Sequence, residues 1–422
     1  MTVIFDKVPH SKEAIARHKR KEIRKVSRRD MGSWVKPIID LCNASITEFF
    51  GEFARYRSQS TKNRVSFSVH PQDLAQALRE KRYNNHIKRG FITKGDAFLG
   101  LGISSASFTQ GFANEGLKTQ QKWAVEMDAN YLNIACQNSP KAYENAHLFC
   151  ATVEEVEKNL LEPVDAFGFS MSCTNHSLAG RAKKGLESAE MGDEVTALFG
   201  VVEMIKAVNP AILISENVPA AKGSITYELL KKEISRLGYE YHEMILDQSH
   251  SGALDRRTRY WMVAVSKGLN IDPANLEPGT PKIIHENFGD IMIDVADDDK
   301  NAWHPISKLT KREEKNIAEG RNFKMKLIDE TATVINTIPR NYTKHQVSNP
   351  HVAHKNGLDY RLIKAIEHAD MKRVPHHLIA HCAETTAHEG LGQGIAYLHG
   401  VGLAEAIARN SFKQLAQQRL PL

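Results

Sequence analysis

Three groups of residues in this chain could share one chemical task. Cys173 follows an apolar run and lies in a turn of small residues, where a thiolate could act as a nucleophile. Glu216 opens the sequence Glu-Asn-Val directly after another apolar run. Arg257 and Arg259 alternate in an extended segment, so they share a face and could hold a phosphate or a base carbonyl. A nucleophile, an acid and paired guanidinium groups suggest covalent activation of a pyrimidine ring.

A glycine-rich loop upstream could bind a nucleoside cofactor. Phe98, Gly100 and Gly102 form F-x-G-x-G at the end of an expected strand, where glycines let the main chain approach a ligand closely. Glu126 ends the next expected strand, and Met127 follows it. An acid at that point commonly holds ribose hydroxyls. The glycines alone would also fit a tight structural turn, and together with the acid they favour a nucleoside cofactor.

Each motif has a structural alternative. Cys173 could be a buried structural cysteine, and His176 is too near in the sequence to favour a Cys–His dyad. Glu216 could be a solvated acid beside a helix-capping Asn217, and the two arginines could be a charged strand start. His377, His381 and Cys382 have a spacing that a metal could use, but packed or surface side chains are the favoured interpretation and no metal is expected.

The motifs fall where an alternating α/β fold places ligands. Apolar strands are expected at 94–99, 121–126, 164–169, 211–215 and 260–265, with helices such as 193–207 and 226–237 between them. This alternation predicts a mainly parallel, doubly wound α/β sheet. Because ligands bind at the carboxyl ends of such strands, the motifs should meet at one edge of the sheet.

Four segments are expected along the chain: a basic N-terminal helical extension (1–90), a catalytic domain (91–268), a smaller target-recognition domain (269–357) and a C-terminal segment that returns to the catalytic domain (358–422). Residues 358–376 and 402–419 are expected to be helical. The basic clusters of the extension are either solvated helix faces or phosphate contacts.

Composition narrows the class of protein. The 422 residues are long enough for two or three domains, and a net charge of +6 favours a polyanionic partner without proving one. The five cysteines form no CxxC pair, which argues against a disulfide framework and fits a reducing cytoplasm. The sequence has no apolar run of about 18 residues, so a membrane span is not expected.

In their order, these motifs resemble the DNA cytosine-5 methyltransferase family from about Lys94 to the C-terminus. The loop matches the family's F-x-G-x-G, and Cys173 lies in a segment similar to P-C-Q-x-F-S-x-A-G. E-N-V is intact, and the two arginines match Q-x-R-x-R. Later matches are Arg361, Glu367 and Pro375, then Gly394 and residues 404–408.

The sequence departs from the family pattern at several positions. Ser172, Thr174 and His176 replace the proline, glutamine and phenylalanine around the nucleophile, and Asp255 replaces the glutamine of Q-x-R-x-R. An acid expected near residues 151–152 is missing, and the terminal element lacks its asparagine. The chain is therefore identified as a divergent member.

The resemblance implies a class I methyltransferase (Rossmann-like) fold that uses S-adenosylmethionine. Its cofactor residues would be Phe98, Gly100, Gly102, Glu126 and Met127. Among the catalytic residues, Cys173 would add to C6 of cytosine and Glu216 would hydrogen-bond N3 and the exocyclic amine. Arg257 would support the O2 side of the base, and Arg259 would order the site.

The partner that the resemblance implies is double-stranded DNA, with the target base flipped out of the helix. Methylation of tRNA is the alternative activity, and a catalytically silent DNA-binding homologue is a further alternative. A companion restriction endonuclease is compatible with the DNA assignment. The chain is expected to be a cytoplasmic, nucleoid-associated monomer with no membrane partner.

Overall fold

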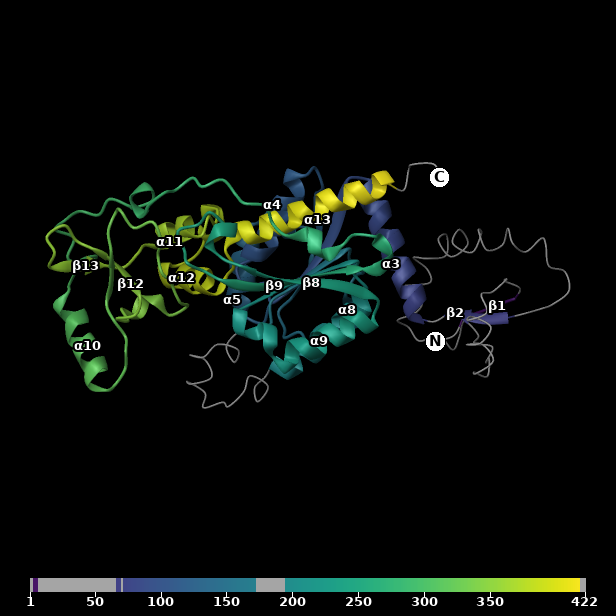
Figure 1. The fold of residues 1–422 in the computed structure, drawn as a ribbon, viewed down its shortest axis with the longest axis horizontal. Coiled ribbons are helices and arrows are strands. Elements are labelled where there is room, and N and C mark those ends of the chain that lie inside the picture. Colours follow the sequence, from purple (N-terminus) through teal and green to yellow (C-terminus); the bar gives the residue numbers. More distant parts are fainter. Residues whose placement is uncertain (1–2, 7–65, 70, 172–193, 418–422) are drawn as a thin grey trace. The chain divides into compact units, whose positions relative to one another are not determined.

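The computed structural model describes residues 3–6, 66–69, 71–171 and 194–417 (Figure 1). The chain divides into two compact units, residues 1–82 and 83–422. In the first unit, β1 (Val3–Asp6) pairs with β2 (Ser66–Val69) in an antiparallel ladder. Helix α3 (Pro71–Lys88) begins in the first unit and ends in the second.

A seven-stranded sheet organises the second unit. Its strands are β3 (Phe91–Ala97), β4 (Lys118–Val125), β5 (His147–Phe149), β6 (Ala166–Phe169), β7 (Ile212–Asn217), β8 (Tyr239–Leu246) and β9 (Arg259–Ser266). They lie in the order β5-β4-β3-β6-β7-β9-β8, and all ladders are parallel except the two that β9 makes. The mainly parallel sheet predicted from the sequence is confirmed.

Helices cover both faces of this sheet (Figure 1). One apolar core joins the sheet to α4 (Ile103–Asn114), α5 (Ala129–Asn138) and α13 (Tyr397–Gln417). The other joins it to α8 (Glu194–Val208) and α9 (Ile225–Arg236). Alternate residues of β7 enter the two cores: Ile212 and Ile214 pack in the first core and Leu213 in the second. The fold is therefore doubly wound.

Short elements connect the larger ones. Helix α6 (Pro140–Tyr143) precedes β5. The 3₁₀ turns are η2 (Lys158–Leu160), η4 (Pro219–Gly223), η5 (Gln248–His250), η6 (Lys267–Leu269), η7 (Pro273–Leu276), η8 (Phe288–Asp290), η9 (Tyr342–Lys344) and η10 (His376–Ile379).

A four-stranded sheet forms a smaller layer after β9. Its strands are β10 (His304–Pro305), β11 (Lys326–Ile328), β12 (Pro350–Ala353) and β13 (Asp359–Arg361), in the order β10-β13-β12-β11. Helix α10 (Ser307–Ala318) accompanies it, and α11 (Ala365–Met371) and α12 (Glu384–Gln393) follow. A separate apolar core includes Phe288, Ile335 and Tyr342. The domain boundaries predicted at residues 90, 268 and 357 stay predictions.

The element boundaries show where the sequence pattern misleads. The helix expected at 358–376 is wrong at its start, because residues 359–361 form β13 and helix α11 begins only at Ala365. Strand β3 begins at Phe91, before the predicted start at residue 94. The sequence pattern misses this start because the buried residues of the strand include the polar Thr93, Lys94 and Asp96. Lys94 pairs with Asp96, and Thr93 Oγ1 donates to Asp165, so these polar side chains are buried with partners and escape a pattern based on hydrophobicity.

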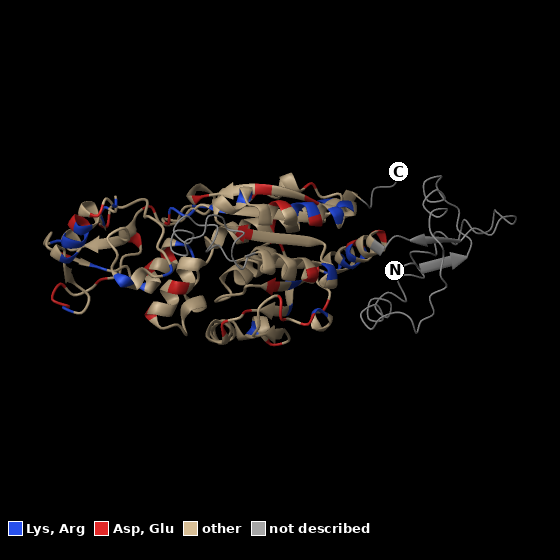
Figure 2. Ribbon diagram, turned by 90° about the horizontal axis from the view of Figure 1, so that it is seen from below, with Lys and Arg blue, Asp and Glu red and all other residues tan. Residues whose placement is uncertain are grey.

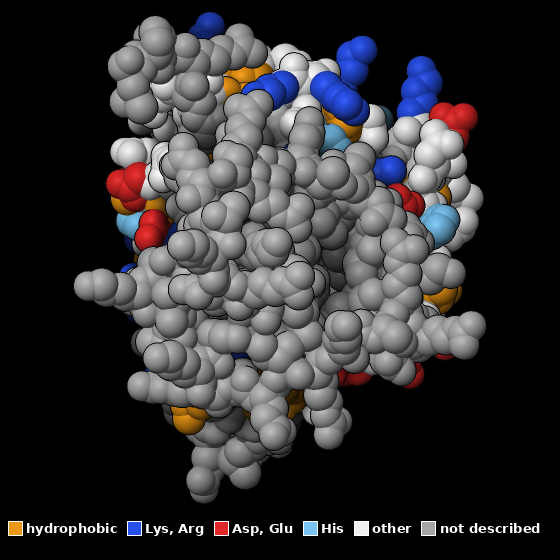
Figure 3. All heavy atoms as spheres, turned by 90° about the vertical axis from the view of Figure 1, so that its right-hand side faces the viewer, with side chains coloured by type: hydrophobic (Ala, Val, Ile, Leu, Met, Phe, Trp, Pro, Cys, Tyr) orange, Lys and Arg blue, Asp and Glu red, His pale blue; other side chains and the backbone are white. Residues whose placement is uncertain are grey.

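The charged side chains are mixed on the molecule. Segments with Lys or Arg and segments with Asp or Glu are interspersed along the described ribbon in Figure 2. Among the described side chains visible in Figure 3, basic, acidic and apolar residues all occur, with Lys and Arg prominent along the upper edge.

Within the described ranges, no helix has the length and apolar character needed to cross a membrane.

Candidate active site

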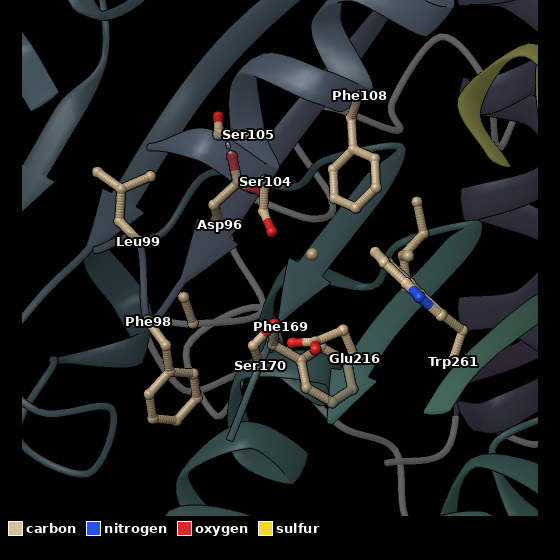
Figure 4. A pocket seen from close by; sticks show the side chains of 13 residues that line it. Asp96, Phe98, Leu99, Ser104, Ser105, Phe108, Phe169, Ser170, Glu216 and Trp261 are labelled. Atoms are coloured by element: carbon tan, nitrogen blue, oxygen red, sulfur yellow. Dashed lines mark hydrogen bonds between the residues drawn. The ribbon is translucent and has the colours of Figure 1, made fainter. Parts of the chain in front are cut away.

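A pocket opens at the carboxyl ends of the parallel strands β3, β6 and β7. Its lining includes Phe98 and Leu99 of the glycine-rich loop, Phe169 at the end of β6, and Glu216 near the end of β7 (Figure 4). Trp261 of β9 adds an aromatic wall. Because parallel strands bring their carboxyl ends to the same edge, motifs far apart in the sequence share this pocket.

The glycine-rich loop runs through left-handed backbone conformations. Phe98, Gly100 and Gly102 have φ angles of 58°, 56° and 77°. A phenylalanine in this region is strained, which is typical of functional sites. A Cβ on Gly100 would meet no atom within 4 Å, whereas one on Gly102 would lie 2.8 Å from the Tyr143 hydroxyl. Gly100 therefore leaves open space beside the main chain, and Gly102 is closed in by packing.

Glu126 holds this loop in place. Its Oε2 accepts a hydrogen bond from the Gly100 amide at 2.7 Å, and its Oε1 accepts one from the Asp128 amide at 2.9 Å. The carboxylate is buried at the end of β4, whereas the neighbouring Met127 side chain is exposed. The acid predicted to bind ribose thus lies against the loop predicted to bind the same cofactor.

Beneath the loop lies a buried polar group that the sequence analysis did not assign. Lys94 Nζ lies 2.7 Å from Asp96 Oδ2, and Ser105 Oγ donates to the same oxygen at 2.8 Å. Burial lowers the pKa of Lys94, and the Asp96 charge partly opposes that shift. Asp96 and Ser105 also line the pocket. The sequence signal for the Lys94–Asp96 pair is an acid two residues after a lysine, because such residues share one face of a strand.

Glu216 and Arg259 form an ion pair at the edge of the pocket. Arg259 Nε lies 2.8 Å from Glu216 Oε1, and both side chains are largely buried. The pair forms because β9 runs antiparallel to β7, with Glu216 opposite Trp261, so the first residue of β9 lies near the last residues of β7. Glu216 is 8% exposed, so the solvated-acid alternative is wrong.

Asn217 has a structural task. Its Nδ2 donates to the Met171 carbonyl at 3.0 Å and to the Tyr227 hydroxyl at 3.3 Å. Its Oδ1 accepts a hydrogen bond from the Val218 amide at 2.8 Å. Asn217 thereby fixes the chain where it leaves β6, two residues before Cys173. Cys173 itself lies outside the described residues, as do Ser172, Thr174 and His176.

Arg257 lies deeper than Arg259. It is almost fully buried, and its Nη2 donates to the Gly392 carbonyl at 2.7 Å. The two arginines therefore have different partners: one holds the acid of the pocket and the other holds the end of α12. Nothing in the sequence indicated the second contact, because 135 residues separate its partners.

The histidines for which a metal-type spacing was noted differ in their surroundings. His381 Nδ1 lies 2.9 Å from Asn138 Oδ1, and His377 is exposed. Among the residues that the structure describes, no group of three His, Cys, Asp or Glu side chains could hold a metal.

Comparison with known proteins identifies the family. The model of the C-5 cytosine-specific DNA methylase family matches residues 93–413, which is most of the chain. The chain belongs to this family. The match begins in β3 and ends in α13, so it includes the glycine-rich loop, Glu216 and both arginines.

Individual members of the C-5 cytosine methylase family share low sequence identity with this chain. The tRNA (cytosine(38)-C(5))-methyltransferase of Mus musculus is 25% identical over 124 residues, 29% of this chain and 29% of that protein. The type II methyltransferase M.MspI of Moraxella sp is 25% identical over 143 residues, 33% of this chain and 32% of that protein. The chain thus matches about a third of the length of each.

A solved structure supports the fold. The Dnmt2 methyltransferase of S. pombe superimposes with a TM-score of 0.55 at 14% identity, covering 78% of this chain and 100% of that one. Counted along the chain, the strand order of the seven-stranded sheet is 3-2-1-4-5-7-6. The class I methyltransferase fold expected from the sequence is confirmed.

Proposed function

We propose that this protein transfers a methyl group from S-adenosylmethionine to C5 of cytosine in double-stranded DNA. The observation that carries the proposal is the pocket itself: Glu216, paired with Arg259, lines the same cavity as the glycine-rich loop. A carboxyl group that can bind a base edge therefore lies beside a loop suited to a nucleoside. Family membership supports the same chemistry.

The residues present fit a nucleoside cofactor. Gly100 leaves open space beside the main chain, and Glu126 lies at hydrogen-bond distance from the Gly100 amide. Phe98 and Leu99 give the pocket an apolar side, and the exposed Met127 follows Glu126. These residues would hold S-adenosylmethionine, with Gly102 shaping the turn. The chemistry that the cofactor supplies is an electrophilic methyl group.

Cytosine must be activated because its C5 is a weak nucleophile. Glu216 would hydrogen-bond N3 and the exocyclic amine, which favours addition of a nucleophile at C6. Cys173 would supply that nucleophile, forming a sulfur–C6 bond and raising the electron density at C5. After methyl transfer, loss of the C5 proton and release of the thiolate restore the aromatic ring and the enzyme.

The two arginines would hold the carboxylate and the base in position. Arg259 binds Glu216 Oε1, so it fixes which way the carboxylate faces. Arg257 would support the O2 side of the base while its Nη2 remains on the Gly392 carbonyl. A bidentate guanidinium group suits both tasks, because it offers donors in a planar fork.

Double-stranded DNA is the substrate we favour. The family model describes a DNA methylase, and a four-stranded layer with a Lys- and Arg-containing helix α10 lies between β9 and α11. Such a layer could contact phosphates and groove edges of a duplex. The similarity to a tRNA methyltransferase keeps tRNA as the alternative substrate. A nucleoid-associated monomer, with or without a companion endonuclease, is part of the DNA proposal.

The test offers duplex DNA and tRNA separately to the full chain with labelled S-adenosylmethionine. We expect label in the duplex, and bisulfite sequencing should show which cytosines carry it. Labelling of tRNA alone would replace the DNA assignment. Cys173→Ala should abolish transfer while cofactor binding is retained, and full turnover in that variant would refute the covalent scheme.

A third arm separates an enzyme from a silent homologue. A duplex carrying 5-fluorocytosine should form a stable covalent complex with the wild-type protein, because fluorine cannot leave as a proton does. Binding of duplex DNA without a covalent complex would identify a catalytically silent protein. In that case Ser172, Thr174 and Asp255 would be the departures to revert first.

A further inference from the structure

Lys94 is a buried lysine in β3, shortly before the glycine-rich loop. Its side chain is only 3% exposed, and its ammonium group has two side-chain partners. Nζ lies 2.7 Å from Asp96 Oδ2 and also donates to Ser105 Oγ. Ser105 Oγ in turn donates to Asp96 Oδ2 at 2.8 Å. The three side chains form a closed network, and loss of the ammonium group would leave the Asp96 charge buried without its cation.

The two partners of Lys94 lie on opposite sides of the glycine-rich loop in the sequence. Asp96 belongs to the end of β3, which leads into the loop, and Ser105 belongs to the first turn of α4, which follows it. The ammonium group therefore joins the strand before the loop to the helix after it. Within the loop, Phe98 has a φ of 58°. Strained backbone of this kind persists only where surrounding contacts hold it, and the Lys94 network supplies such contacts.

An irregularity in the sheet adds a further side chain to this network. The ladder between β3 and β4 shifts register beside Lys94, because Lys94 lies opposite Gln121 whereas Gly95 lies opposite Trp123. Gln121 Nε2 donates to the Trp123 carbonyl at 2.6 Å, and its Oε1 lies 3.3 Å from Ser105 Oγ. A Cβ on Gly95 would lie 2.2 Å from the Trp123 ring, so glycine is required there. Bulges commonly redirect side chains beside active sites, and this one brings Gln121 to Ser105.

Asp96 and Ser105 connect the buried network to the pocket. Both side chains line the pocket (Figure 4), and Lys94 binds them from the interior of the fold. A Cβ on Gly168 of β6 would lie 2.7 Å from Asp96 Oδ1, so the neighbouring strand leaves space for this second oxygen. With Oδ2 bound by Lys94 and Ser105, and Oδ1 against Gly168, the carboxylate is held at both oxygens.

We propose that Lys94 is a positioning residue for the cofactor. By binding Asp96 and Ser105 together, it holds the glycine-rich loop in the shape that S-adenosylmethionine requires, and it acts through these two residues without touching the cofactor. The inference rests on the proposed function, because it assigns the loop to that cofactor. A preformed loop favours binding, since no ordering of the loop opposes it. Loss of the ammonium group should therefore weaken cofactor binding as well as the fold.

Lys94→Met tests this role, because methionine keeps an unbranched apolar chain and lacks the ammonium group. In the full chain we expect a lower unfolding temperature, since Asp96 loses its cation. Isothermal titration calorimetry should show an affinity for S-adenosylhomocysteine weakened by about tenfold or more. The KM for S-adenosylmethionine should rise by a similar factor, while kcat at saturating cofactor stays within about threefold of wild type.

A purely structural role predicts a different result for the same variant. Lys94→Met would then lower the fraction of folded protein, and the folded fraction would bind S-adenosylhomocysteine with the affinity of the wild type. The titration would show fewer binding sites and an unchanged dissociation constant. That outcome would overturn the proposal.

Two further variants decide the question if Lys94→Met does not fold. Asp96→Asn removes the buried acid, and the double variant Lys94→Met/Asp96→Asn removes both charges, so neither leaves a carboxylate without its cation. The two proteins differ at residue 94 alone. We expect the double variant to bind S-adenosylhomocysteine at least about threefold more weakly than Asp96→Asn. Equal affinities would contradict the positioning role of Lys94.

The matched control is Lys231→Met in α9. Lys231 is another largely buried lysine, and it pairs with Glu228 and Glu243, which are not among the residues that line the pocket. This variant should have a lower unfolding temperature and an unchanged affinity for S-adenosylhomocysteine. A loss of affinity equal to that of Lys94→Met would show that any broken buried ion pair weakens binding, and the specific role of Lys94 would fall.

The wild-type protein separates this inference from the proposed function. If it binds no S-adenosylhomocysteine, the cofactor assignment and the role of Lys94 fail together. If it binds this ligand but methylates neither duplex DNA nor tRNA, the proposed reaction fails, and the titrations of Lys94→Met still decide the role of Lys94. If wild type and Lys94→Met bind the ligand equally well, only the inference about Lys94 fails.

Discussion

Two glycines with a left-handed backbone, one inside and one outside the loop, offer a matched test of the cofactor loop. Gly100 has a φ of 56° in the loop, and Gly116 has a φ of 82° in the exposed turn between α4 and β4. A Cβ at either position would meet no atom within 4 Å. Replacement by alanine therefore costs only the conformational strain, about 1–2 kcal/mol at each position.

The two variants should be alike in stability and different in binding. We expect Gly100→Ala and Gly116→Ala each to lower the unfolding temperature by about 1–3 °C. Gly100→Ala should also weaken binding of S-adenosylhomocysteine by about tenfold or more, equivalent to about 1.4 kcal/mol, because a methyl group would occupy the space that a ligand needs. Gly116→Ala should bind this ligand like the wild type.

Thermal unfolding and isothermal titration calorimetry measure the two quantities separately. Unchanged affinity in Gly100→Ala would refute the reasoning that the open space beside this residue belongs to the cofactor. Weakened affinity in Gly116→Ala would show that strain elsewhere in this unit also reduces binding. The loss in Gly100→Ala could then not be assigned to the geometry of the loop.

Three further changes test other contacts. Asn217→Ala removes the hydrogen bond to the Met171 carbonyl, so the free energy of unfolding should fall by about 1–3 kcal/mol. The kcat should also fall, while the affinity for S-adenosylhomocysteine stays unchanged. A normal kcat would contradict this anchoring role. Glu216→Gln leaves Arg259 without its charge partner, and labelled methyl transfer should be lost while the chain still folds in circular dichroism. Burial lowers the pKa of His399 to about 4, so its neutral form stabilises the fold. Since the unfolded chain binds the proton first, this contribution should decline as pH falls from about 6.5 to 4, by about 3 kcal/mol in total, and His399→Gln should flatten that part of the stability–pH curve.

The parts of the fold that could be predicted are those that local pattern controls. Strands β6, β7 and β9 are short apolar runs buried on both faces, and the motifs lie at or just beyond their ends. Strand β8 was missed because it lies at the edge of the sheet and its exposure varies along its length. Its pattern is therefore not that of a continuous apolar run.

Contacts between distant segments set the limit for the site. Glu216 and Arg259 could each be selected from the sequence, but their pairing depends on the reversed direction of β9. Lys372 is fully buried, and no local pattern of the sequence marks it as buried. A lysine at the end of a short helix normally favours solvent, so only the packed structure reveals its burial.

The antiparallel direction of β9 also determines how rigid the acid–arginine pair is. Glu216 and Arg259 belong to adjacent strands whose main chains are linked by ladder hydrogen bonds, and neither is carried by a free-standing loop. The two groups are therefore held by the sheet itself and not by the loops that border the pocket. The Glu216–Arg259 pair is thus preorganised, so substrate binding carries no free-energy cost for assembling it.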